Sequence, residues 1–236
     1  MKDKVLLSSI KRSGHHAIAN WICNQSSREC RRISAGKRSL MDGCPVENGV
    51  VVFKNNGGKP IKIYDQEEIT PEEIEVVSQK VDCTAIIVIR DIYNMLASML
   101  RWEKERNGII GRHESIRSTK IRLDRWVNFA DEVLSPTFNH TDILFNKWFT
   151  DDAYRESICL ELGLEFTDKG KQAVAGHGGG SSFDRREFNG KADQMDVLNR
   201  YKSYADDPLF NSLISEEMHE KCHALFDVPF FGSDIK

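Results

Sequence analysis

Residues 5–17 read Val-Leu-Leu-Ser-Ser-Ile-Lys-Arg-Ser-Gly-His-His-Ala, which predicts a strand, a basic turn and the start of a helix. The apolar run Val5 to Leu7 is typical of a buried parallel strand, and residues 17–22 continue as a helix. A strand that turns through glycine into a helix directs backbone N–H groups and the helix dipole at one point, which suits a phosphate. Lys11 and Arg12 add charge there, and the arginine fork fits phosphate oxygens. The stretch therefore predicts an anion site.

The composition limits the class of protein. The chain has 236 residues, 40% of them hydrophobic and 29% charged, which is ordinary for a globular protein with one large domain or two small ones. A formal net charge of -3 argues against bulk binding of nucleic acid, so an anion site must be local. No apolar run is long enough to span a bilayer, and the N-terminus lacks the apolar region of a signal peptide. We expect a cytoplasmic protein without a membrane span.

The cysteines support the same expectation. They show neither a C-x-x-C pair nor a His-x-x-x-His partner, and they are scattered over the chain as Cys23, Cys30, Cys44, Cys83, Cys159 and Cys222. This spacing favours reduced thiols over a disulfide framework or a zinc site.

Short apolar strands alternate with amphipathic helices. We expect further strands at residues 50–54, 84–89 and 142–145, and helices at 67–80, 92–106, 116–133, 152–162 and 215–226. The alternation predicts a single three-layer α/β domain over residues 1–236, with a mainly parallel sheet flanked by helices. Its core covers residues 4–165, and a glycine loop and helices follow over 170–236. Ligands of such sheets bind outside the carboxyl ends of the strands.

Two polar segments allow a structural and a functional interpretation. Residues 26–38 are rich in Arg and Ser and fit either a solvated loop or a basic rim over an anion. Residues 176–182 read Gly-His-Gly-Gly-Gly-Ser-Ser and fit either a flexible connection or a loop around a phosphate. Arg185 and Arg186 follow closely and favour the phosphate. The tryptophans lie on expected elements, so we expect core positions for Trp21, Trp102, Trp126 and Trp148.

A second cationic turn follows the strand at 84–89. Arg90 stands at the end of this strand, and Ser98 lies eight residues further, on the next helix. The two side chains can hold one phosphate from two directions, although Arg90 beside Asp91 also fits a structural ion pair. Together with the first turn, the pair predicts a ligand that carries phosphates at two ends.

Both turns resemble signatures of the sulfotransferase family, enzymes that use 3'-phosphoadenosine 5'-phosphosulfate (PAPS). In that family a loop of the form basic-Ser/Thr-Gly-Thr-Thr holds the 5'-phosphosulfate, and the matching residues are Arg12, Ser13, Gly14, His15 and His16. An Arg that ends a later strand and a Ser eight residues beyond hold the 3'-phosphate, which matches the spacing of Arg90 and Ser98. Residues 142–148 and 160–164 are also similar to the end of the family's core, so the resemblance covers roughly residues 5–164.

The resemblance implies a P-loop NTPase-like sulfotransferase fold and transfer of a sulfuryl group from PAPS to a hydroxyl or amine acceptor. Lys11 and Arg12 would then bind the bridging oxygen and 5'-phosphate, with Ser13, Gly14, His15 and His16 as donors. Arg90 and Ser98 would bind the 3'-phosphate, and the late loop would contact the 3'-phosphate or adenine through Gly179, Gly180, Ser181 and Ser182. No metal is expected, and the acceptor is a small molecule, lipid or glycan.

The chain departs from the family at two points. His15 and His16 stand where relatives have two threonines, but histidine also donates to phosphate or sulfonyl oxygens. Relatives often carry Lys-Thr-His after the next strand, with the His as general base; residues 54–56 read Lys-Asn-Asn, which keeps the cation and lacks the base. Lys54 would stabilise the sulfonyl group. We expect the base to be His15 or His16, with His113 and His177 as alternatives, so the catalytic set is Arg12, His15, His16 and Lys54.

Two other classes remain open. A P-loop nucleotide-binding protein or small-molecule kinase requires G-x-x-x-x-G-K-[ST]. Here Ser9 replaces the first glycine and Gly14 is followed by two histidines. A non-catalytic protein of the same fold that binds a nucleotide or a sulfated glycan is favoured by the missing Lys-Thr-His histidine. The sequence leaves the acceptor and the oligomeric state open.

Overall fold

The computed structural model describes residues 2–35, 37–43, 47–53, 59–107, 113–176 and 180–228. Its centre is a six-stranded sheet in the order β3-β2-β4-β1-β5-β6. The strands are β1 (Lys4–Ser9), β2 (Cys30–Ala35), β3 (Glu47–Phe53), β4 (Ile61–Glu67), β5 (Thr84–Ile89) and β6 (Thr141–Leu144). Every neighbouring pair of these strands is parallel except β2 with β3. The expected mainly parallel sheet is confirmed.

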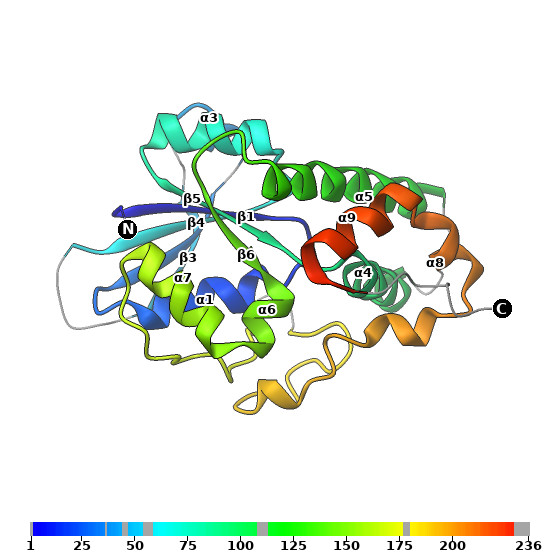
Figure 1. Ribbon diagram of the computed structural model, residues 1–236. Helices are drawn as coiled ribbons and strands as arrows, with labels where there is room; N and C mark the ends of the chain where they lie inside the picture. Colours follow the sequence, from blue (N-terminus) through cyan, green and yellow to red (C-terminus); the bar gives the residue numbers. More distant parts are fainter. Residues whose placement is uncertain are drawn as a thin grey trace.

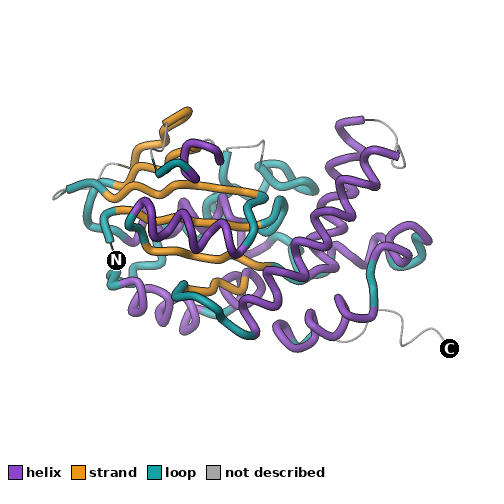
Figure 2. Tube along the Cα trace, turned by 90° about the horizontal axis from the view of Figure 1, so that it is seen from above, coloured by secondary structure: helices purple, strands orange, loops and turns teal. Residues whose placement is uncertain are grey.

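Helices cover both faces of the sheet, which gives three layers (Figures 1 and 2). Figure 1 shows α3 (Pro71–Val81) and α5 (His113–Leu134) over one face, and α1 (His15–Gln25), α6 (Phe145–Thr150) and α7 (Asp152–Leu162) over the other. The remaining helices are α2 (Lys37–Met41), α4 (Ile92–Asn107), α8 (Pro208–Leu213) and α9 (Glu216–Phe226). None of the helices within the described ranges is long and apolar enough to cross a bilayer.

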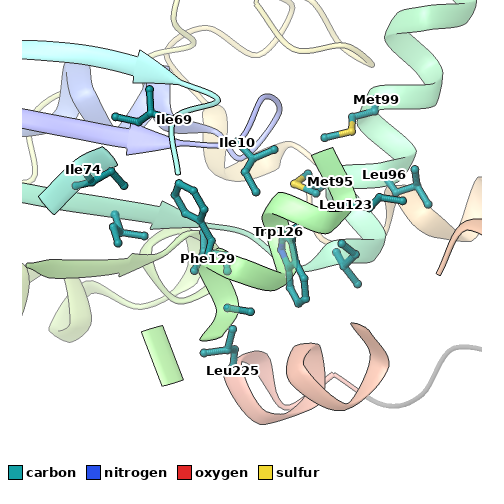
Figure 3. Packing of buried hydrophobic residues seen from close by; sticks show 14 of the residues in the cluster. Ile10, Ile69, Ile74, Met95, Leu96, Met99, Leu123, Trp126, Phe129 and Leu225 are labelled. Carbon is teal, nitrogen blue, oxygen red and sulfur yellow. The ribbon is translucent and has the colours of Figure 1, made fainter. Parts of the chain in front are cut away.

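The core is divided by the sheet into two clusters of buried side chains. Successive residues of a strand point to opposite faces, so Leu6 packs under α3, α4 and α5 while Val5 and Leu7 pack against α1 and α7. Figure 3 shows the first cluster, with Trp126 and Phe129 of α5 in its centre. Three of the four tryptophans are buried in the core, as expected, whereas Trp102 is half-buried beside a cavity.

Helix α3 has the expected cap but a different start. Thr70 accepts from the Glu73 N–H while the Glu73 carboxylate accepts from the Thr70 N–H, which forms a capping box. The helix therefore begins at Pro71, and the predicted start at residue 67 is wrong because β4 runs through Glu67. Gly163 ends α7 in the left-handed conformation, as expected.

Residues 26–38 form neither a loop nor a free basic rim. Strand β2 occupies residues 30–35 of this segment, and four of the segment's cations contact carboxylates nearby. Arg28 contacts Asp3, Arg31 contacts Glu29, and Lys37 contacts Glu73. Arg32 is buried against Asp65 of the neighbouring strand β4. The expectation of a solvated loop is wrong for residues 30–35, because β2 pairs with β3 on one side and β4 on the other.

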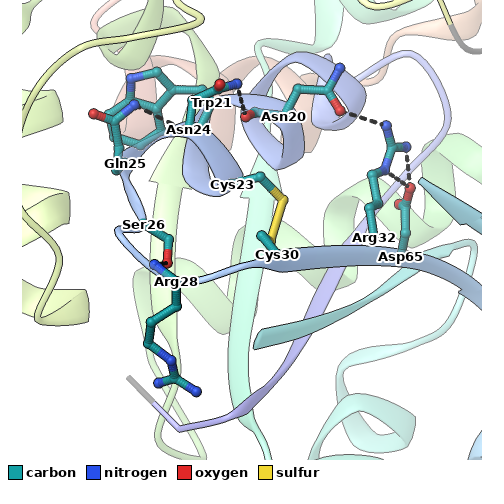
Figure 4. Close-up of a disulfide and its surroundings, with 10 residues drawn as sticks. All are labelled: Asn20, Trp21, Cys23, Asn24, Gln25, Ser26, Arg28, Cys30, Arg32 and Asp65. Atoms are coloured by element: carbon teal, nitrogen blue, oxygen red, sulfur yellow. Dashed lines mark hydrogen bonds and ion pairs between the residues drawn. A yellow bond between two sulfur atoms is a disulfide. The ribbon is translucent and has the colours of Figure 1, made fainter. Parts of the chain in front are cut away.

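A disulfide joins Cys23 near the end of α1 to Cys30 at the start of β2 (Figure 4). Their Cα atoms lie 5.4 Å apart, a normal spacing for a disulfide, and both residues are buried. The prediction of reduced thiols is therefore wrong for this pair, which the turn from α1 into β2 brings together without a sequence motif. Cys83, Cys159 and Cys222 are free and buried, and Cys44 lies outside the described residues. Location in the cytoplasm stays a prediction.

Candidate functional site

The turn between β1 and α1 has a backbone that only particular residues permit. Arg12 adopts φ 74° and Gly14 adopts φ 82°, both in the left-handed region. A Cβ atom on Gly14 would lie 2.3 Å from the ring of Phe145, so glycine is also required by space. The Ser13 N–H donates to the carbonyl of Ile10 at 3.2 Å and closes the turn. This is the strand, basic turn and helix that the sequence predicts.

The N-terminus of α1 is available to an anion. Gly14 is the N-cap residue, and among the described residues no side chain caps the helix there. The Ala17 N–H bonds back to the carbonyl of Gly14 at 3.0 Å, while the N–H groups at the very start of a helix have no partner within it. These groups and the positive end of the helix dipole point toward the turn.

A cavity of about 320 Å³ lies at the carboxyl end of the sheet, where the predicted segments meet. Its lining includes these residues expected from the sequence: Lys11, Arg12, Gly14, His15, His16, Arg90, Ser98, Gly180 and Ser181. Two expected residues stand behind the lining, because the Ser13 hydroxyl donates to Sδ of Met95 and the Ser182 hydroxyl contacts Oγ of Ser98. Lys54, Gly179 and His177 lie outside the described residues, as does the side chain of His113.

Arg12 and Ser98 connect the two predicted phosphate subsites. Nε of Arg12 donates to Oγ of Ser98 at 3.2 Å, and Oγ of Ser98 lies 2.6 Å from Oγ of Ser182. Burial lowers the pKa of Arg12, which nevertheless remains a cation at neutral pH. The first turn, helix α4 and the late loop thus present a guanidinium and two hydroxyls at one wall of the cavity.

Arg90 combines a lining position with a structural role. It is only 2% exposed, and its guanidinium donates to the backbone carbonyls of Arg12 (3.4 Å) and Val197. It also lies 4.9 Å from the ring centre of Phe145 and 3.9 Å from the carboxylate of Asp91. Burial lowers the pKa of Arg90 to about 9. Arg90 therefore lines the cavity beside the Asp91 carboxylate, and its binding of a phosphate stays a prediction.

Residues 180–201 form the outer wall of the cavity. In Figure 1 they run past the end of the sheet where β1 and β5 finish. The Asn94 side chain of α4 donates to the carbonyl of Leu198 at 2.9 Å and accepts from the Tyr201 N–H at 3.3 Å. Arg200 lines the cavity and donates to the Ser181 hydroxyl at 2.8 Å and the Asp184 carboxylate at 2.7 Å. Arg200 was not expected, because no local pattern marks it in a polar stretch.

Carboxylates on β4 surround the histidines of α1. Nε2 of His15 lies 2.8 Å from Oδ1 of Asp65, and Nδ1 of His15 lies 3.2 Å from Oε1 of Glu67. Nδ1 of His16 lies 3.7 Å from Oδ2 of Asp65 and also contacts Arg32. Nε of Arg32 donates to Oδ2 of Asp65 at 2.6 Å (Figure 4).

This network shifts two pKa values. Burial raises the pKa of Asp65, but the contacts with His15, His16 and Arg32 outweigh it and hold the pKa well below its ordinary value. Burial lowers the pKa of His16 to about 4, despite its contact with Asp65. Asp65 is therefore ionised and His16 neutral at pH 7.

The same cluster was tested as a metal site. One ring nitrogen of each histidine and one oxygen of Glu67 lie within 4.8 Å of one another. Both nitrogens of His15, however, face carboxylates, which accept hydrogen bonds from N–H groups. Nδ1 of His16 contacts Arg32 and accepts from it. Lys11 and Arg12 line the same cavity. The donor set suits hydrogen bonds to an anion better than coordination of a cation.

Asp65, Glu67 and Lys171 belong to the site but were not predicted from the sequence. The first two end strand β4, which the alternation of Ile61 and Ile63 with polar residues would have indicated. Lys171 is buried and lines the cavity, with its ammonium 4.3 Å from the ring centre of Phe149. Nothing in its local sequence distinguishes it from a surface lysine.

The arrangement is similar to a solved structure, the crystal structure of mouse sulfotransferase SULT7A1 complexed with PAP. The TM-score is 0.57 at 15% sequence identity, and the match covers 93% of this chain and 84% of that chain. The fold is that of a sulfotransferase. No protein-family model and no curated protein matches the sequence. The expected fold is confirmed, while residue roles depend on the geometry of this chain.

Proposed function

We propose that the protein transfers a sulfuryl group from PAPS to a hydroxyl or amine acceptor. The observation that carries the proposal is the convergence of the uncapped α1 N-terminus, Arg12 and Ser98 on one cavity. These groups come from two strand-to-helix turns that are far apart in the sequence, and the sulfotransferase of similar fold was crystallised with PAP, the desulfated nucleotide. A ligand with phosphates at two ends fits both turns.

The lining residues divide into two binding groups. The backbone N–H groups at Gly14, His15 and His16, with the Lys11 ammonium, would hold the 5'-phosphosulfate at the N-terminus of α1. The 3'-phosphate would lie against Ser98, Ser181 and the cations Arg90 and Arg200, while Arg12, which donates to Ser98, would reach the 5'-phosphate. Gly180 and the expected Gly179 would allow close approach of the late loop, with Ser182 supporting Ser98 from behind.

Sulfuryl transfer requires alignment and charge neutralisation. The acceptor oxygen attacks sulfur in line while the bond from sulfur to the 5'-phosphate oxygen breaks, so negative charge develops on the leaving phosphate. Lys11, Arg12 and the helix dipole of α1 would stabilise that charge. Lys54 stays a prediction for the sulfonyl oxygens. Met99 and Trp102 of α4 border the cavity and would contact the acceptor.

Calorimetry with PAP tests the nucleotide site. We expect PAP to bind in the presence of EDTA, and 5'-AMP, which lacks the 3'-phosphate, to bind at least about 10-fold more weakly because charge-assisted hydrogen bonds are lost. Absence of PAP binding would overturn the proposal. Tighter binding of ATP with magnesium than of PAP would instead favour a nucleotide-binding protein or kinase, and PAP binding without transfer of labelled sulfate would favour a non-catalytic binder.

A further inference from the structure

Strand β4 brings a carboxylate to the N-terminus of α1. β4 lies beside β1 in the sheet, and Glu67 is the register partner of Ser9, the last residue of β1. Residues 54–56, where the sequence analysis looked for a base, follow β3 at the edge of the sheet. The segment next to the anion-binding turn is therefore the end of β4, and its Glu67 side chain is 27% exposed and lines the cavity.

From this placement we propose that Glu67 is the general base that takes the acceptor proton, and that His15, Asp65 and Arg32 hold it in position. The inference rests on the proposed sulfuryl transfer and names a residue of that reaction. Glu103 also lines the cavity but stands on α4, whereas Glu67 contacts His15 at the helix end that would hold the phosphosulfate.

His15 fixes the orientation of Glu67. The imidazole is 2% exposed, with Nδ1 3.2 Å from Glu67 and Nε2 2.8 Å from Asp65. Each ring nitrogen thus faces a carboxylate, so the ring cannot turn without losing both contacts. A buried ring in this position restrains Oε1 of Glu67, whose side chain lines the cavity.

Arg32 anchors the other end of this chain of contacts. It donates to Asp65 from Nε at 2.6 Å and to Oδ1 of Asn20 from Nη1 at 3.1 Å, as Figure 4 shows. Arg32 belongs to β2, Asp65 to β4 and Asn20 to α1, so three elements fix the network. The Arg32 guanidinium helps to hold the pKa of Asp65 below its ordinary value.

His16 is the weaker candidate for the base. Arg32 contacts its Nδ1, and because an arginine only donates, a neutral His16 accepts at Nδ1 and carries its hydrogen on Nε2. Such a ring donates to a phosphate or sulfonyl oxygen and has no free lone pair for the acceptor proton. His16 thus keeps its place in donor binding, and the proton goes to Glu67.

The step balances without an oxidant or a metal. The acceptor O–H proton moves to the Glu67 carboxylate as the bond from acceptor oxygen to sulfur forms. The bond from sulfur to the 5'-phosphate oxygen breaks, and its electron pair stays on that oxygen. Protonated Glu67 then returns its proton to water at the mouth of the cavity. A positioned base of this kind contributes about 10²- to 10⁴-fold to a rate.

The test compares Glu67→Gln with the wild type and with Glu156→Gln, which removes an exposed carboxylate of α7. The probes are ³⁵S-PAPS with cyclohexanol, with water and with 4-nitrophenol at a pH where this phenol is ionised. We expect Glu67→Gln to transfer to cyclohexanol and water about 10²- to 10⁴-fold more slowly, while transfer to the ionised phenol, which has no proton to lose, and PAP affinity stay unchanged. Glu156→Gln should match the wild type throughout.

The positioning of Glu67 by His15 and Asp65 is tested separately, by the kcat and pH profile of a variant of Asp65. Asp65→Asn should lower kcat with cyclohexanol and shift its pH profile without changing kcat for the ionised phenol, and formate should restore part of the activity of Glu67→Ala. Equal losses for both acceptors, full activity of Glu67→Gln with cyclohexanol, or a wild type that binds PAP but turns over none of the probes would each overturn the inference. A wild type that fails to bind PAP would instead overturn the proposed function.

Discussion

Nε of Arg12 donates a hydrogen bond to Oγ of Ser98 over 3.2 Å, although the two residues are 86 positions apart in the chain. The contact joins the turn after β1 to helix α4 at the wall of the cavity. Each side chain is thereby held in place before a ligand arrives, and such preorganisation reduces the cost of binding.

The first prediction follows from this contact. Arg12→Ala should weaken PAP binding about 10- to 100-fold and Ser98→Ala about 3- to 10-fold, since a charge-assisted hydrogen bond is worth more than a neutral one. The double variant should lose less than the sum of the two, because each single change already breaks the shared contact. Calorimetry measures all three. The control is Arg31→Ala, which removes an arginine of β2 that is paired with Glu29. This variant should bind PAP like the wild type. Wild-type affinity in Arg12→Ala would contradict the assignment.

The second prediction concerns the backbone of the same turn. Gly14→Ala should lower the free energy of unfolding by about 2–5 kcal/mol, because it combines a strained φ of 82° with a clash against the Phe145 ring. Gly190→Ala is a matched control, since Gly190 has φ 88° but nothing within 4 Å of a Cβ, so it should lose only about 1 kcal/mol. Urea unfolding gives both values. Equal losses would show that the contact with Phe145 does not matter.

The third prediction is a pH dependence of stability that His16 causes. Burial lowers its pKa from 6.5 to about 4, so between these values the unfolded chain binds a proton that the folded chain does not. The free energy of unfolding must therefore fall as the pH falls from about 6.5 to about 4, with a contribution from His16 of up to about 3 kcal/mol. His16→Gln should remove that part of the slope in urea unfolding at several pH values. His223→Gln, on the exposed side of α9, should keep the wild-type slope; an unchanged slope in His16→Gln would refute the assignment.

The fourth prediction concerns the disulfide. It closes a short loop between α1 and β2, with Cys23 and Cys30 seven positions apart in the sequence, so removal should cost about 2–3 kcal/mol of stability through the unfolded chain. Cys23→Ala/Cys30→Ala should unfold at lower urea concentration than the wild type. A reductant should bring the wild type toward the variant but leave the variant itself unchanged. Alkylation under denaturing conditions that labels both cysteines without reduction would show that the pair is not bonded.

The two strand-to-helix turns were predictable because their signals are local. An apolar run, a basic turn with Gly14 and a helix start lie within residues 5–17, and the strand before Arg90 is short and apolar. Local signals also placed the cap of α3 at Thr70 and the end of α7 at Gly163. Since parallel strands end at one edge of a sheet, the convergence of the two turns followed from the fold class.

The partners of these residues could not be read from the sequence. Pairing between β4 and β1 decides that Asp65 and Glu67 lie beside His15, and strand order is a long-range property. The disulfide and the Arg32–Asp65 contact depend on the same order of strands, because β2 also lies beside β4. Arg200, at the start of a short 3-10 helix (Arg200–Tyr204), and Lys171 reach the cavity from segments with no periodic signal in the sequence.

The hydrogen bond from Arg90 to the carbonyl of Val197 has a consequence for folding during synthesis. A ribosome makes the sheet strands and α4 long before it makes residues 180–201, which supply the outer wall and the hydrogen-bond acceptors for Arg90 and Asn94. A nascent chain that stops short of this segment keeps a guanidinium at the sheet edge without its carbonyl, and such a group resists burial. We therefore expect a chain that ends before residue 197 to lack the outer wall of the cavity and to leave the proposed nucleotide site incomplete, however well its sheet has formed.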